Sequence, residues 1–223
     1  MKLIPQVPLL LLLFNAAVSL PLGAETRFSP AGGDKSLIRV DGTSNVRDWH
    51  AETRNVRGEL KLGVPGFWSG EGLDPKKLPA SPEKGLAFHV DIPAKSLDGD
   101  GSRFNNNLHD YIKARQYETI RFEFTSLELE ENQQELITTR VTGDLTFAGV
   151  TKPLTFPVNW EREGDNLVLR GKAEFKMSEF GISPPRMMMG ALRTADKVTV
   201  IFTWVLEPET GGAIARSATE PSP

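Results

Sequence analysis

Apolar and polar residues alternate along most of the chain between residues 28 and 206. Successive side chains of a strand point to opposite faces, so this alternation is what a sheet with one buried and one solvated face requires. The clearest alternating runs cover residues 86–92, 120–124, 154–160, 167–175 and 198–206, and weaker runs cover residues 37–40, 56–62 and 136–147. The pattern predicts an all-β protein with about eight antiparallel strands.

The apolar phase slips between Phe124 and Leu127, which predicts a bulge or bend in one long strand. Long bent strands help a sheet to close on itself and so remove its exposed edges. A closed barrel of eight strands has an interior just wide enough for one small ligand. A β-sandwich carries the same alternation, so the periodicity alone leaves barrel and sandwich open.

Two segments depart from the strand pattern. Residues 63–85 are rich in glycine and proline and predict a long loop, with Phe67 and Trp68 in its middle. These aromatic residues could gate a cavity mouth, but we favour an anchoring role for them. Residues 103–114 carry apolar side chains at helical spacing after Ser102, a good N-cap residue, and predict one short amphipathic helix.

Residues 1–24 have the layout of a secretory signal peptide: a lysine, an apolar run over residues 7–14, and small residues ending at Ala24. We expect cleavage after Ala24, with Ser19 as the alternative. A membrane anchor is disfavoured because the apolar run is much shorter than the roughly 20 residues that span a bilayer. The protein is therefore expected to be secreted.

The rest of the chain predicts one barrel domain over residues 25–207 and a disordered tail over residues 208–223, because apolar periodicity stops there. The chain contains no cysteine, so neither disulfides nor thiolate metal sites are available to it. Its formal net charge of −3 and the lack of a basic stripe argue against nucleic acid as a partner.

No catalytic or metal-binding set is recognisable. The three histidines, His50, His89 and His109, have no metal-ligand spacing, and neither HExxH nor GxSxG occurs. Asp98 and Asp100 faintly resemble a calcium loop, but the twelfth position, which should be a bidentate glutamate, is His109. We expect a protein without enzymatic activity, cofactor or metal.

Four segments resemble motifs of the YceI-like family. Residues 106–122 are similar to its central motif, in which a helix leads through an aromatic residue into an I-x-F strand. Residues 142–154 resemble its GdLti-GvtkPv segment, residues 175–182 its late f-i--sdfGI segment, and residues 42–49 the GtS-vhdW opening of one branch. The resemblance implies an extended, lipocalin-like antiparallel barrel in the bacterial periplasm, which in characterised relatives encloses a polyisoprenoid or similar long lipid. Glu118 departs from the proline that relatives commonly carry before the I-x-F strand.

The candidate ligand-binding residues are apolar side chains expected to face the barrel interior, together with one methionine of a turn. They are Leu60, Phe88, Val90, Phe122, Phe124, Leu145, Phe147, Phe175, Met188, Val200 and Phe202. For each of them, ordinary core packing is the alternative interpretation. His109 and Arg186 are candidate contacts for a polar or anionic head group, with a solvated surface position as the alternative.

The leading hypothesis is a carrier that holds a long-chain apolar ligand, such as a polyisoprenoid or quinone, inside the barrel. The competing hypothesis is an envelope interaction module with a filled core, which binds a protein partner through its surface or through the 63–85 loop. A continuous internal cavity favours the carrier, and a solid interior favours the module. An exposed edge or apolar patch could in addition support a homodimer.

Overall fold

The computed structural model describes residues 25–209 except for residues 70–71, 134–135 and 188–190. The expected signal peptide, most of the expected tail and Met188 lie outside the described residues.

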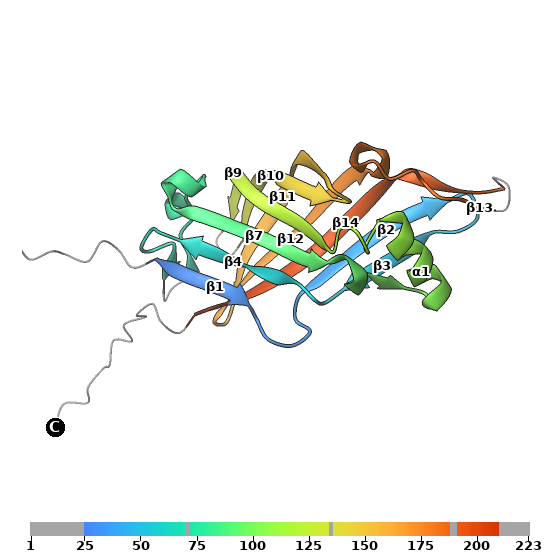
Figure 1. The fold of residues 1–223 in the computed structure, drawn as a ribbon. Helices are drawn as coiled ribbons and strands as arrows, with labels where there is room; N and C mark the ends of the chain where they lie inside the picture. Colours follow the sequence, from blue (N-terminus) through green and yellow to red (C-terminus); the bar gives the residue numbers. More distant parts are fainter. Residues whose placement is uncertain (1–24, 70–71, 134–135, 188–190, 210–223) are drawn as a thin grey trace, which may run out of the picture.

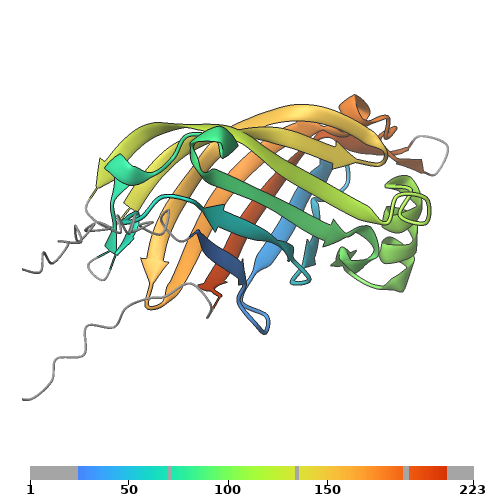
Figure 2. The ribbon, with the colours of Figure 1, turned by 60° about the vertical axis from the view of Figure 1, so that its left-hand side comes forward.

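Eight antiparallel strands close into a barrel (Figures 1 and 2). Each strand pairs with the next in the order given, and the last strand pairs with both its predecessor and the first. The strands are β1 (Thr26–Pro30), β4 (Arg57–Leu62), β7 (Leu86–Pro93), β9 (Thr119–Gln133), β10 (Leu136–Phe147), β11 (Val150–Glu163), β12 (Asn166–Lys176) and β14 (Leu192–Pro208). The predicted eight-stranded antiparallel barrel is confirmed, and the closed circuit decides against a sandwich.

The long strand β14 has different partners at its two ends. Its last residues pair with β1, whereas its earlier part pairs with β2 (Leu37–Ser44), which continues the sheet through β3 (Trp49–Thr53) to β8 (Asp98–Gly99). The short strand β13 (Arg186–Met187) pairs with the start of β14, and β5 (Trp68–Ser69) pairs with β6 (Gly72–Leu73) as a separate ribbon. The sheet is thus extended at one end of the barrel beyond the eight-stranded ring.

The phase slip in β9 is a β-bulge, as predicted. Phe124 lies opposite Gly143 and Ser126 lies opposite Thr142, so that Thr125 has no partner in the ladder. The extra residue explains how Phe124 and Leu127 are both buried although they are three positions apart.

The described residues form one α-helix, α1 (Ser102–Tyr111), which lies at one end of the barrel, where the sequence predicts a helix (Figures 1 and 2). The proposed N-cap was wrong by one position: Gly101 caps the helix with a φ of 87°, and Ser102 is its first residue. Short 3₁₀ turns complete the connections, namely η1 (Pro75–Lys77), η2 (Pro82–Lys84), η3 (Ala94–Ser96) and η4 (Met177–Phe180).

The interior is packed as two hydrophobic clusters, one towards each end of the barrel. The floor cluster lies away from α1 and includes Phe28, Leu60, Phe67 and Trp160, all of them fully buried. The cap cluster lies beneath α1 and is formed by side chains of β10, β14, η3, η4 and the segment after α1. The cavity described below lies between the two.

The 63–85 loop is anchored to the floor cluster through its aromatic pair. The Phe67 ring is wholly buried and meets Trp160 edge to face at 6.2 Å, and the Trp68 ring meets Phe28 at 5.3 Å. The Arg162 guanidinium covers Trp68 at 4.4 Å from the ring centre. The favoured interpretation of these aromatic residues as anchors is therefore confirmed.

Candidate functional site: an apolar cavity inside the barrel

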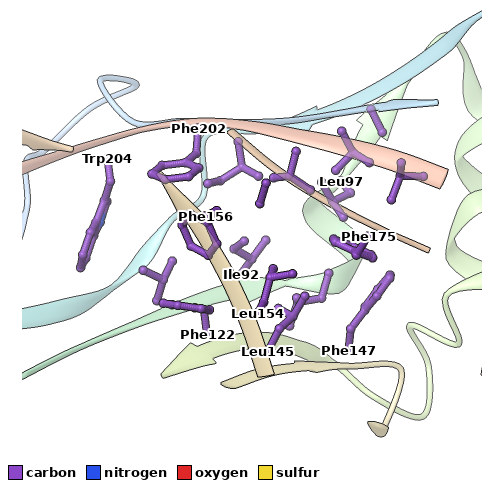
Figure 3. Close-up of a pocket in the computed structure, with 18 of the residues that line it drawn as sticks. Ile92, Leu97, Phe122, Leu145, Phe147, Leu154, Phe156, Phe175, Phe202 and Trp204 are labelled. Atoms are coloured by element: carbon purple, nitrogen blue, oxygen red, sulfur yellow. The ribbon is translucent and has the colours of Figure 1, made fainter. Parts of the chain in front are cut away.

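A cavity of about 170 Å³ occupies the barrel interior between the two clusters. Every residue that lines it is apolar, and the lining side chains come from all the long strands and from the α1 end (Figure 3). In Figure 3, Trp204 lies at one end of the cavity, and Leu97, Phe147 and Phe175 lie towards the other. A cavity with this lining can hold hydrocarbon.

The wall follows directly from strand alternation. On β14 the inward positions Val198, Val200, Phe202 and Trp204 all line the cavity, whereas Ile201 between them is 44% exposed on the outside. Burial of the inward row and hydration of the outward row stabilise the same strand register.

Three inward-facing glycines make room for aromatic rings on the wall. A β-carbon on Gly171 would lie 2.4 Å from the ring of Phe202, its partner across the ladder, and one on Gly143 would lie 2.4 Å from the ring of Phe122. A β-carbon on Gly42 would lie 2.1 Å from the ring of Trp49, its partner across the ladder. Because a glycine leaves the sheet surface bare, each ring lies close against the wall instead of projecting across the lumen.

The floor of the cavity is aromatic. Phe88 stacks on Phe124 at 4.5 Å and lies 6.0 Å from Trp204 and 6.3 Å from Trp160. Phe88 and Trp204 line the cavity, while Phe124 and Trp160 belong to the solid floor cluster behind them.

The opposite end of the cavity is covered by Leu97, Leu108, Ile112 and Met177. Helix α1 is held there by few contacts. The backbone N–H of Gly99 donates to the Asn105 side-chain oxygen at 2.8 Å, His109 Nε2 lies 2.8 Å from the Leu97 carbonyl oxygen, and Phe104 lies 6.0 Å from Trp49. No residue of α1 itself is fully buried, so this end is the less firmly packed one.

The structure places most, but not all, of the expected ligand-binding residues on the cavity wall. Leu60 and Phe124 face inward as expected but lie in the floor cluster, below the end of the cavity. The residues of the expected set that line the cavity are Phe88, Val90, Phe122, Leu145, Phe147, Phe175, Val200 and Phe202.

The two expected head-group contacts are not on the wall. His109 is part of the helix attachment described above, and Arg186 is exposed on β13, outside the cavity lining. Met188 lies outside the described residues.

Sequence reasoning missed Trp49 and Trp204 as lining residues. Both have the inward phase of their strands, and both strands also contain or face the inward glycines described above. The available signal for Trp204, which pairs with Leu169, was its inward phase, whereas Trp49 also pairs with the inward Gly42.

None of the described residues that line the cavity has a titratable side chain, and the shifted pKa values belong to groups outside the lining. Lys197 and Lys172 hold the pKa of the Glu174 carboxyl at about 2 on the outer face of the barrel. Hydrogen bonds that Arg170 donates to Glu163 and Glu161 raise the pKa of Arg170, which also faces outward. These shifts mark surface ion pairs and do not mark a reactive centre.

The described part of the chain offers neither a cluster of metal ligands nor a helix that could span a membrane. No group of three or more histidine, aspartate or glutamate side chains is arranged to hold a metal ion there. Within the same residues, no helix combines the length and apolar character needed to cross a bilayer.

The family model of the YceI-like domain matches residues 38–206 of the chain. Among solved structures, BcnA of Burkholderia cenocepacia is 21% identical with a TM-score of 0.60, over 77% of this chain and 96% of that one. A polyisoprenoid binding domain from Saccharophagus degradans, implicated in plant cell wall breakdown, is 12% identical with a TM-score of 0.55, over 81% and 97% of the two chains. At these sequence identities, the structural similarity shows only that the chains share a fold.

A curated relative, a UPF0312 protein of Pseudomonas fluorescens, is 28% identical over 104 residues, which are 43% of this chain. The matched segment spans 52% of that protein, about half of its length.

Proposed function

This chain belongs to the YceI-like family, and from that premise we propose that it binds a long-chain apolar molecule, such as a polyisoprenoid, a quinone or a similar lipid, inside the barrel. The observation that carries the proposal is the cavity in the barrel interior, whose described lining residues are all apolar. The relative from Saccharophagus degradans, described as a polyisoprenoid binding domain, supports this ligand class.

Burial of hydrocarbon is a sufficient source of affinity. Each methylene moved from water to an apolar site contributes about 0.8 kcal/mol. Ten methylenes would contribute on the order of 8 kcal/mol, which corresponds to about micromolar affinity before the entropic costs of binding. No polar recognition motif is then required, in keeping with a wall that offers none.

The proposed role is carriage or sequestration without catalysis. We further propose that residues 1–24 direct the protein to the periplasm and are removed there, since they have the composition of a signal peptide. The competing hypothesis, a module with a filled core, receives less support because the interior contains a cavity.

Filling the cavity tests the proposal. Ala173 is an inward residue of the wall, 5% exposed, and Ala87 is an outward residue of β7. We expect Ala173→Phe to weaken the binding of farnesol at least tenfold, measured by quenching of tryptophan fluorescence, because the new ring occupies the lumen. Ala87→Phe, the matched control, should bind farnesol like the wild type. Equal affinity in the two variants would show that the ligand binds elsewhere.

A further inference from the structure

The cavity does not run the whole length of the barrel, because the aromatic floor closes it. Phe88 and Trp204 form the surface of the floor, with ring centres 6.0 Å apart. Behind them Phe124 and Trp160 fill the lumen, and Trp160 is itself backed by Phe67 from the 63–85 loop. The floor is therefore supported from below by fully buried side chains and cannot yield without disrupting the core.

The depth of the cavity follows from the strands that line it. On β14 the wall runs from Trp204 to Val198, and on β12 it runs from Leu169 to Phe175, which are seven residues and six steps in each case. Six steps of about 3.3 Å on strands tilted by about 40° reach about 15 Å along the barrel axis. A volume of about 170 Å³ spread over this depth leaves room for no more than one hydrocarbon chain.

We propose that the Phe88–Trp204 floor is a length stop, so that the protein encloses the end of a single chain of about twelve carbons. In an extended zigzag chain, carbon–carbon bonds of about 1.5 Å each advance about 1.25 Å along the chain, so about twelve of them span the depth of the cavity. The inference rests on the proposed function and adds a limit to it. A longer ligand keeps its remaining carbons outside the cavity, at the α1 end. The affinity then depends on chain length below the limit and no longer depends on it above the limit.

A homologous series of saturated 1-alkanols from six to sixteen carbons, delivered from cyclodextrin, measures the limit. Below the limit, each added methylene should lower Kd about fourfold. A methylene contributes about 0.8 kcal/mol to binding, and about 1.4 kcal/mol corresponds to a tenfold change in Kd. At about twelve carbons the decrease in Kd should stop.

Two variants of the floor should move this break in opposite directions. Phe88→Leu lowers the floor and should move the break to a longer alkanol. Leu169→Phe adds a ring beside Trp204, its partner in the ladder, and should move the break to a shorter one. Phe28→Leu, a matched change in the floor cluster away from the cavity wall, should leave the break in place. Circular dichroism establishes that each variant is folded.

The outcomes separate the two proposals. A wild-type Kd that keeps falling by the same factor to sixteen carbons, or a break that neither floor variant moves, would overturn the length stop while leaving apolar binding intact. Failure of every alkanol to bind would overturn the proposed function itself.

Discussion

Trp160 is the buried indole whose hydrogen bond can be tested most simply. Its Nε1 donates to the Thr139 hydroxyl at 2.9 Å, and both side chains are completely buried. We predict that Thr139→Val lowers the free energy of unfolding by about 1–3 kcal/mol, because the indole N–H is left buried without an acceptor. Urea denaturation measures the change.

Thr142→Val is the control for that prediction. Thr142 forms a comparable hydroxyl pair with Thr155 at 3.0 Å, but on the exposed face, where water can replace the lost partner. If the two valine variants were equally stable, the buried hydrogen bond would contribute nothing.

Asp196 makes the cap end of the barrel sensitive to acid. Its carboxylate accepts hydrogen bonds from the Ser178 hydroxyl and backbone N–H, at 2.5 and 2.8 Å, and these bonds lower the pKa of Asp196. A lowered folded-state pKa contributes stability that is present above the unfolded value of about 3.9 and is lost as the pH falls through the folded value.

Asp196→Asn should therefore make the loss of stability below about pH 4 shallower than in the wild type, measured as the urea midpoint against pH. Glu174, with its pKa held at about 2, retains its own acid-dependent contribution in this variant. Asp165→Asn, in the turn between β11 and β12, is the control. An unchanged slope in Asp196→Asn would contradict the assignment.

At the scale of the strands, an inward glycine opposite an aromatic ring keeps the lumen open. Gly171→Ala would place a methyl group 2.4 Å from the Phe202 ring and 2.6 Å from the Pro157 carbonyl oxygen. Because the backbone oxygen cannot move away, we predict that the ring is displaced into the cavity. The Kd of 1-dodecanol should rise, and stability should fall by about 1–3 kcal/mol through overpacking.

The control for this prediction is Gly32→Ala, since no atom lies within 4 Å of the added methyl group. Binding and denaturation are measured on both variants. Undiminished dodecanol binding by folded Gly171→Ala would mean that the Gly171–Phe202 pair does not shape the site.

Most strands and the bulge in β9 could be predicted from sequence because both are properties of a local period. Alternation identifies an inward position, and a slip of phase between Phe124 and Leu127 reveals an extra residue. Closure of the barrel could not be predicted in this way, since it depends on pairing between β1 and β14, which are far apart in the chain. The exact helix cap was missed because Gly101 acts through its backbone conformation.

The cavity could not be predicted from the sequence for a related reason. The alternation along each strand predicts that Leu60, Phe88 and Phe124 face inward, but it does not predict how far along the barrel each residue lies. Only Phe88 borders the cavity, since the region below it is filled in part by Phe67 from an aperiodic loop. Core and cavity wall are therefore made of the same residue types in the same phase.

At the scale of the whole molecule, the barrel has a firmly packed floor, an apolar cavity and a cap held by a few contacts. This asymmetry fits a container that admits a chain end past α1 and stops it at the floor. We predict that the cavity holds one apolar chain.

Native mass spectrometry of the protein, expressed with its own N-terminal segment and purified from the periplasm, tests this claim most directly when it is followed by organic extraction and lipid analysis. We predict one stoichiometric adduct that extracts as an isoprenoid, quinone or other apolar chain and that Ala173→Phe lacks. A ligand-free mass that persists after incubation with polyprenyl lipids and quinones would contradict the account.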